Sequence, residues 1–355
     1  MSRTFLARIA AGSFVAVALA CGYDSTQPYG TPAGTPPPDT SAVISASLDG
    51  LWTSSGSDPA LLRLSAAQLT GHRNIVSAST ITTASASLGS LNSIAFDDAG
   101  TLWVASENDD LLLGFGADRI DTTRLSIATR VIAPIDSSLA GPSSIAFDRQ
   151  NRLWVANAAR GTIVRFDASQ LAAGGQAVPA VTIEGIGHPA SIAFDADGAL
   201  WMSDNLANRL FKFGAAKLAA SGGPAPDVVI TAGTAFSLKS PQGIAFDSDG
   251  KLWVANPGRG NLVAYDAAQQ ATGGPVVPSV AIALAPTDAN SPVGLAFDST
   301  RALWVVSIDG SLARLDRASL EASGQPAASV TLRVEQRSLL WSVALWPKVR
   351  GLPLN

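Results

Sequence analysis

The chain has 355 residues, a formal net charge of −4, 15% charged residues and 47% hydrophobic residues. This composition is too apolar and too low in charge for a disordered protein. It also lacks a basic stripe that would neutralise phosphates, so we expect no nucleic-acid partner.

The first 20 residues predict a signal peptide. Arg3 and Arg8 supply a positive segment, and an apolar run follows over 9–20. A helix needs about 20 apolar residues to cross a bilayer, so this run is too short to be a membrane anchor. We therefore expect an exported protein and exclude 1–20 from the fold.

Cys21 is the only cysteine and directly follows Ala18-Leu19-Ala20. The run resembles a bacterial lipobox, in which a lipidated cysteine becomes the new N-terminus, although Ala18 stands where that motif usually has Leu. The alternative is a plain cleavage site followed by an incidental cysteine. We favour lipidation because a single thiol in an oxidising compartment has no partner in its own chain. The expected location is the bacterial cell envelope, with a soluble periplasmic or secreted protein as the alternative.

A spacer separates this cysteine from the folded part. Residues 21–41 contain five prolines and several glycines, which support neither a helix nor a strand ladder: Pro28, Pro32, Pro36, Pro37, Pro38. Such a segment suits a domain tethered to a surface. The only membrane contact that we expect is the lipid anchor.

Residues 42–355 repeat one motif. In its clearest copy, Ile244-Ala245-Phe246-Asp247 and Asp249-Gly250 precede Leu252-Trp253-Val254-Ala255-Asn256. Related segments begin at Ile94, Ile145, Ile192 and Leu295, each followed by a Leu-Trp pair, and Leu51-Trp52 is a further pair. A fixed period of about 50 residues predicts a modular array.

Each copy predicts four strands. Ile-Ala-Phe and Leu-Trp-Val-Ala are apolar without strict alternation, which favours strands buried on both faces, and Asp-Gly between them is a hairpin turn. Thr162–Phe166 and Val181–Ile183 exemplify the third and fourth strands. Four-stranded antiparallel units around a channel predict an all-β fold, a six-bladed β-propeller.

The C-terminal segment predicts how the ring closes. Ser342–Trp346 resembles a first strand but has no unit after it, while the copy at Leu51-Trp52 has only a weak first strand near Val43. We expect Val343–Trp346 to complete the first blade, so that no sheet edge stays open. A seventh, incomplete blade is the alternative.

The copy that begins at Ile244, together with Asn261-Leu262-Val263-Ala264-Tyr265-Asp266, resembles an NHL repeat. The resemblance covers about residues 42–347 and implies a propeller. Propellers of this and related types include sensors, ligand-binding domains, gluconolactonase/regucalcin-like metal lactonases and streptogramin lyases. It therefore implies no single activity.

Candidate site residues lie on the face where the chain enters strand one and leaves strand two. Glu107, Asp204 and Asn205 end second strands, and His188 precedes Pro189 before a first strand. Asn92 and Gln242 occupy the position just before strand one. Asp204, like Asn157 and Asn256, has the alternative role of capping the next turn, which Asx side chains do readily.

Other residues argue against a metal site. The pairs Asp195 with Asp197 and Asp247 with Asp249 fit tight turns better than calcium loops. The lactonase resemblance implies metal ligands before strand one, where this chain has Asn92, Ser143, Ala190, Gln242, Val293 and Trp341, with no carboxylate. The streptogramin-lyase resemblance implies a catalytic His in late blades, which contain none. We expect no metal and no cofactor.

These observations favour a binding or scaffold propeller whose partner is an unknown small molecule, glycan or peptide. We expect a monomer. The alternative is a hydrolase or lyase that uses His188, Glu107 and Asp204 at the channel mouth. Convergence of those three side chains would favour the enzyme.

Overall fold

The computed structural model describes residues 50–56, 60–76, 79–82, 89–120, 127–233, 238–285, 289, 291–335 and 339–346. The chain divides into two units, Met1–Asp39 and Thr40–Asn355, and the second contains all the described residues. The signal peptide, Cys21 and the spacer lie outside them. None of the helices among these residues has the length and apolar character needed to cross a membrane.

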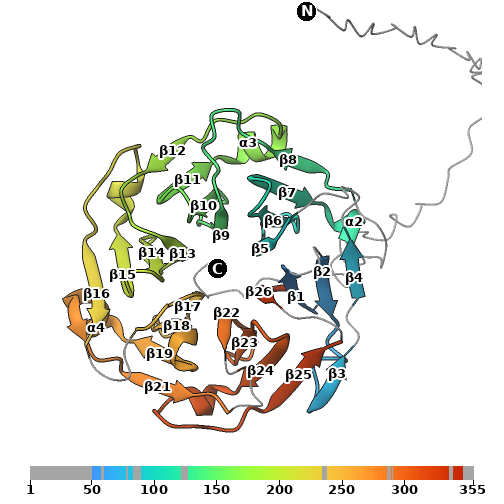
Figure 1. Ribbon diagram of the computed structural model, residues 1–355, viewed down its shortest axis with the longest axis vertical. Helices are drawn as coiled ribbons and strands as arrows, with labels where there is room; N and C mark the ends of the chain where they lie inside the picture. The colour runs from blue at the N-terminus through green and yellow to red at the C-terminus, as the bar shows by residue number, and fades with distance from the viewer. Residues whose placement is uncertain are drawn as a thin grey trace, which may run out of the picture. The chain divides into compact units, whose positions relative to one another are not determined.

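The second unit is a ring of six sheets, here called blades one to six (Figure 1). Blades one to three have the strand order, from the centre outward, β26 (Leu340–Trp346), β1 (Gly50–Ser55), β2 (Ala60–Leu64), β4 (Ser79–Thr82); β5 (Leu91–Phe96), β6 (Leu102–Ser106), β7 (Leu111–Phe115), β8 (Arg130–Ile132); and β9 (Pro142–Phe147), β10 (Leu153–Asn157), β11 (Thr162–Phe166), β12 (Val181–Ile183). The prediction of a six-bladed propeller is confirmed.

Blades four to six continue the pattern: β13 (Pro189–Phe194), β14 (Leu200–Asp204), β15 (Arg209–Phe213), β16 (Val228–Ala232); β17 (Ile244–Phe246), β18 (Leu252–Asn256), β19 (Asn261–Tyr265), β21 (Val280–Ala283); and β22 (Pro292–Phe297), β23 (Leu303–Ser307), β24 (Ser311–Leu315), β25 (Val330–Val334). Short helical turns precede the outer strands, namely α2 (Ala117–Ile120), α3 (Ala168–Ala173), η1 (Ala215–Leu218), α4 (Ala267–Thr272) and η3 (Arg317–Leu320), and η2 (Pro257–Arg259) follows β18.

Two blades have a fifth strand, so the prediction of four-stranded antiparallel blades is correct for only four sheets. β20 (Gly274–Val276) pairs in parallel with β16, and β3 (Arg73–Val76) pairs in parallel with β25. At three other blade junctions Gly175, Gly222 and Gly324 form single parallel bridges to the outer strand of the preceding blade. These glycines therefore form backbone links between neighbouring blades at the rim.

The ring closes as the sequence predicts. Leu51 pairs with Leu345, Trp52 with Ala344 and Thr53 with Val343, so the last strand of the chain is the innermost strand of blade one. The parallel pairing of β3 with β25 joins the same two blades again at the rim. Residues from both ends of the described chain thus hold blades one and six together.

An aspartate fixes the turn after strand one in blades two to six. In blade four, Asp195 Oδ1 accepts the amides of Asp197 and Ala199 at 3.0 and 2.9 Å, while its Oδ2 accepts the Trp201 indole N–H at 3.1 Å. Gly198 in this turn has φ of 77°, which favours glycine. The structure thus gives Asp195 the role of a turn residue that also orients the buried tryptophan.

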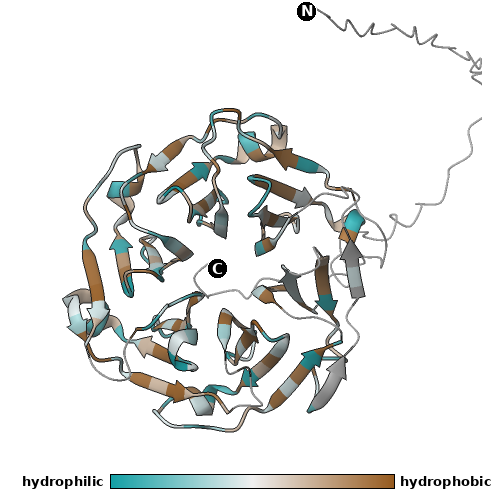
Figure 2. Ribbon diagram, viewed as in Figure 1, coloured by the Kyte–Doolittle hydropathy of each residue, from teal (hydrophilic) through white to brown (hydrophobic). Residues whose placement is uncertain are grey.

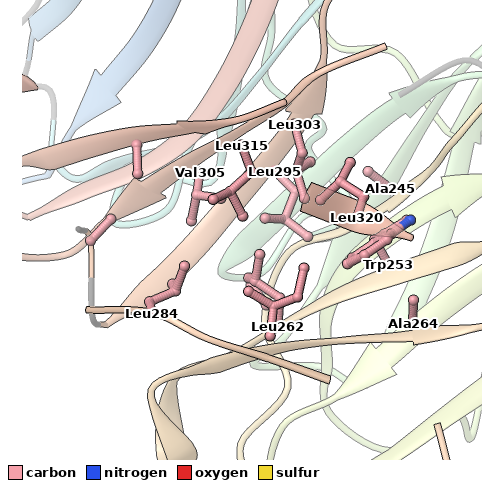
Figure 3. Packing of buried hydrophobic residues seen from close by; sticks show 14 of the residues in the cluster. Ala245, Trp253, Leu262, Ala264, Leu284, Leu295, Leu303, Val305, Leu315 and Leu320 are labelled. Carbon is pink, nitrogen blue, oxygen red and sulfur yellow. The ribbon is translucent and has the colours of Figure 1, made fainter. Parts of the chain in front are cut away.

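The hydrophobic core lies between neighbouring blades. Figure 2 shows hydrophobic stretches along the strands of the ring. Between blades five and six, Trp253 and Leu262 of one sheet pack with Leu303 and Leu315 of the other (Figure 3). The tryptophans of strand two are almost fully buried in every blade: Trp52, Trp103, Trp154, Trp201, Trp253, Trp304. Each junction between blades is therefore a layer of interleaved side chains.

Candidate functional site

A central cavity of about 200 Å³ opens where the first strands of the six blades meet. Its lining includes the residue at the start of strand one from every blade: Asn92, Ser143, Ala190, Gln242, Val293, Trp341. Because these positions are equivalent in the repeat, the fold brings them to one mouth. The cavity takes part of its chemistry from how this position varies around the ring, and Glu107, His188 and Asn205 line it from other positions of the repeat.

Serine hydroxyls fasten neighbouring blades one layer below the mouth. Ser93 Oγ accepts the Ile145 amide at 3.0 Å, and Ser144 Oγ accepts the Ile192 amide at 3.1 Å. Ser191 Oγ likewise accepts the Ile244 amide, and Ser342 Oγ accepts the Ile94 amide, each at 3.3 Å. These contacts satisfy backbone groups that would otherwise be buried without a partner.

Glycine replaces this serine in blades five and six, where the backbones approach each other directly. The Gly243 amide donates to Val293 O at 2.9 Å, and a Cβ on Gly243 would lie 2.4 Å from that same oxygen. A Cβ on Gly294 would lie 2.9 Å from Trp341 O. Only glycine allows these approaches without a shift of the backbone.

Blade two places a carboxylate in the cavity. Glu107 Oε2 accepts the Asn92 side-chain amide at 2.8 Å, and Asn92 Oδ1 in turn accepts the Ser90 hydroxyl at 2.8 Å. The Glu107 amide donates to Ser90 O, which holds the end of β6 against the chain before β5. Two predicted site residues, Asn92 and Glu107, therefore form one hydrogen-bonded unit facing the cavity.

Blade four contributes a histidine. His188 Nδ1 lies 2.8 Å from Asn205 Oδ1, and both side chains line the cavity and are partly exposed. This contact orients the imidazole through an amide. Gln242 of blade five also lines the cavity, while its carbonyl oxygen accepts the Ser203 hydroxyl at 2.7 Å.

Asp204 does not line the cavity. It is 3% exposed, and its Oδ1 accepts the amides of Leu206 and Ala207 at 3.1 and 2.9 Å. The alternative role of capping the next turn fits this geometry. The adjacent Asn205 lies one residue beyond the end of β14, which is why it reaches the cavity when Asp204 remains buried.

The equivalent asparagines also hold loops. Asn157 accepts the Ala140 amide at 3.2 Å and donates to Ser138 O at 2.9 Å. Asn256 accepts the Lys239 amide at 2.6 Å. In the part of the chain that the structure describes, no three His, Cys, Asp or Glu side chains come close enough together to hold a metal ion.

The opposite wall is apolar and includes a residue that the prediction omitted. Trp341 lines the cavity with Val293, next to the polar groups of blade two. Gly56 leaves room for the indole, since a Cβ there would lie 2.5 Å from Trp341 Nε1. The repeat alignment places Trp341 at the same position as Asn92 and Gln242, and that equivalence was the signal for it.

Few of the side chains that line the cavity are ionisable. Glu107 is the carboxylate in its lining and His188 the imidazole; the remaining polar groups are amides and hydroxyls. The mouth therefore has a polar side, with Glu107, His188 and Gln242 of blades two, four and five, and an apolar side, with Val293 and Trp341 of blades six and one. This asymmetry fits a ligand with one apolar face and a polar edge.

Comparisons with known proteins agree with the fold. No family model and no curated protein matches the chain. A crystal structure of a protein from Lactobacillus plantarum is similar over 83% of this chain and 98% of that one, at 15% identity and a TM-score of 0.54. The likeness concerns the fold alone.

Streptogramin-type lyases are also among the similar structures. A streptogramin B lyase has 16% identity over 64% of this chain and 66% of its own, with a TM-score of 0.47. A virginiamycin B lyase from Staphylococcus aureus has 16% identity over 64% and 67%, with a TM-score of 0.46. The match thus spans about two thirds of each lyase, and the site of this chain is argued from its own residues.

Proposed function

We propose that the protein is a propeller tethered to the cell envelope that binds a small, hydroxyl-rich molecule at its channel mouth. The observation that carries the proposal is the pairing of Trp341 with a polar half that contains Glu107, His188 and Gln242. A pyranose ring has one apolar C–H face and a rim of hydroxyls. Such a ring, free or at the end of a glycan, matches both halves of the site.

The alternative is a hydrolase or lyase, and two of its three expected residues line the same cavity. Glu107 and His188 both face it, but Asp204 caps a backbone turn. His188 Nδ1 is held by an amide oxygen rather than by a carboxylate. We favour binding because Asp204 is held in a turn and the contact of His188 Nδ1 is to an amide, so the three expected side chains do not form one acid–base group.

Substitutions at the two halves of the mouth test the proposed function. We expect Glu107→Gln to weaken binding by about 10-fold or more, because a charge-assisted hydrogen bond contributes roughly 1.5–3 kcal/mol. Trp341→Leu removes the flat indole and should weaken binding by about 3- to 10-fold. The measurement is saturation-transfer NMR with a panel of methyl glycosides and N-acetylated monosaccharides on the chain from residue 21 with Cys21→Ser.

The matched control is Leu206→Ala. Leu206 is 72% exposed in the loop after β14, beside Asn205 but outside the cavity lining. This variant should bind like the parent. Binding that survives both mouth substitutions, or a panel in which no sugar binds, contradicts the proposed function. Turnover of a glycoside or ester that Glu107→Gln abolishes would favour the enzyme instead.

The proposed tether has its own test. Cys21 follows the apolar export segment, and a lipid on it would hold the domain at a membrane through the spacer 21–41. We expect Cys21→Ser to move the protein from the membrane fraction to the soluble fraction. Cell fractionation and the intact mass of the purified protein measure this. An unmodified Cys21 in a soluble wild-type protein would refute the tether.

A further inference from the structure

Four blades share an arrangement on the face away from the mouth, in which a basic residue lies opposite the buried tryptophan of strand two. The residue opposite the buried tryptophan is basic in each: Arg63 faces Trp52, Arg165 faces Trp154, Lys212 faces Trp201 and Arg314 faces Trp304. The cation lies over the indole at 5.9, 5.7 and 5.4 Å for Arg63, Arg165 and Lys212 respectively. A cation in this position is attracted by the electron-rich ring face.

In two of these blades the basic side chain also forms an ion pair with the aspartate of the turn after strand one. Lys212 Nζ lies 3.0 Å from Asp195 Oδ2, and Arg314 Nε lies 2.9 Å from Asp298 Oδ2. Burial raises the pKa of Asp298, but its hydrogen bonds from Thr300 and Arg314 outweigh this and hold the pKa below its usual value. The site formed by aspartate and tryptophan therefore favours a cation.

Blade two has the turn aspartate, Asp97, but has no basic residue opposite its tryptophan. Gly114 stands opposite Trp103, where blades one, three, four and six have Arg or Lys and blade five has Ala264. Asp97 still accepts the Ala99 and Thr101 amides and the Trp103 indole N–H, at 2.9, 2.8 and 3.1 Å. The ion pairs found among the described residues include none with Asp97, which is only 9% exposed.

A cavity of about 400 Å³ opens next to Asp97 and Trp103. Asp97, Thr101 and Trp103 of blade two line it, together with Leu171 of α3 in blade three. It lies at the end of β5 opposite Asn92, and the two cavities share no lining residue. The cavity lies where a basic side chain at position 114, equivalent to Lys212 in blade four and Arg314 in blade six, would extend.

We propose that this cavity binds the cationic end of an alkylguanidinium or alkylammonium ligand. The cation lies over Trp103 and donates to Asp97 Oδ2, as Lys212 and Arg314 do to their own aspartates. The alkyl chain runs along Leu171. This inference concerns a second site and does not depend on the function proposed for the channel mouth.

Arg130 is the competing occupant. It stands across from Gly114 on β8 and lines the cavity, where sister blades have Val181, Val228 and Val330. Its Nη1 donates to Thr129 O at 2.9 Å, and the side chain is exposed. Asp118 also lines the cavity, but it forms an ion pair with Arg119, with Nε 3.2 Å from Oδ2, so the ion pairs of the described residues involve Asp118 and not Asp97.

The test compares butylguanidinium with butylurea, which has the same shape and no charge. We expect butylguanidinium to shift the Trp103 indole N–H signal in NMR spectra, assigned by Trp103→Phe, and butylurea to bind at least 10-fold more weakly. The affinity of n-butylammonium, compared with that of butylguanidinium, shows which of the two cations the site prefers. Equal binding of butylguanidinium and butylurea would overturn the proposal.

Two variants locate the site. Gly114→Arg supplies the missing cation from the chain itself and should abolish binding and raise the Tm. Its Cβ would lie 3.1 Å from Arg130 Cβ and 3.2 Å from Trp103 Cη2, so these neighbours must shift by a few tenths of an ångström. Arg130→Val removes the competitor and should preserve or strengthen binding. Val277→Arg, at an exposed position in blade five, adds the same charge elsewhere and should change nothing.

The outcomes are decisive in both directions. Binding that persists in Gly114→Arg places the ligand elsewhere and refutes the site. Loss of binding in Arg130→Val shows that the arginine recruits the ligand, which also refutes it. Asp97→Asn should lower the affinity at least 10-fold, and its Tm is measured in parallel because Asp97 also holds the turn.

Discussion

Deleting residues 339–355 is expected to abolish the cooperative fold or to lower the Tm by more than about 10 °C, with aggregation. β26 supplies the innermost strand of blade one, where Leu340 and Val343 are buried. Its Trp346 packs against Phe96 of blade two with ring centroids 5.0 Å apart. The deletion exposes the edge of β1 and apolar faces of two neighbouring blades.

Calorimetry and light scattering measure this effect. The control is a shorter deletion, 348–355, which leaves β26 whole and should keep the Tm within a few degrees of wild type. A protein that lacks 339–355 and melts like wild type would contradict the closure of the ring by its last strand. The comparison separates the strand from the residues that follow it.

The second large effect concerns the buried tryptophans. We expect Trp154→Ala to lower the free energy of unfolding by about 3–5 kcal/mol, through lost burial and a cavity between blades. Trp154 is fully buried, its indole donates to Asp148 at 2.9 Å, and Arg165 lies over its ring. Urea unfolding followed by circular dichroism measures the change.

Trp154→Phe is the matched variant. It keeps a ring in the core but loses the hydrogen bond to Asp148, so we expect about half the loss of Trp154→Ala or less. A loss below about 1 kcal/mol for the alanine variant would mean that the tryptophan is not a core residue. That result would contradict the assignment of strand two.

The repeat made most of the ring predictable. The Leu-Trp pairs mark strand two because a buried strand with a fixed large residue recurs in every blade, and the orphan Ser342–Trp346 marks the closure. The same alignment brought Asn92 and Gln242 to the channel mouth, since equivalent positions in a closed ring face one axis. Repetition thus turns a sequence position into a place in space.

Backbone links at the rim were beyond this reasoning. β20 and β3 join the blades before them through amides and carbonyls, and such contacts leave no side-chain pattern. The Ser93 hydroxyl likewise serves an amide of the next blade, so its role depends on a neighbour that the repeat itself does not specify. The bridge between Gly175 and Ile132 is another such backbone contact, which the side-chain pattern does not predict.

The sequence predicted which residues lie at the mouth, but not which of their side chains form hydrogen bonds with one another. Glu107 and Asn205 end the second strand in the same way, yet one pairs with Asn92 and the other with His188. The omission of Trp341 has a simple reason: an aromatic residue before a strand predicts core packing as readily as a ligand contact. The sequence pattern did not predict the cavity beside Trp103, because a glycine in strand three does not by itself indicate a missing basic side chain.

A crystal structure of the chain from residue 21, with Cys21→Ser, soaked with the tightest-binding sugar of the panel tests the central claim most directly. The account predicts density for the sugar in the central cavity, with its apolar face on Trp341 and a hydroxyl within hydrogen-bonding distance of Glu107 or His188. Density for the sugar only at another surface, with the mouth filled by water alone, would contradict it.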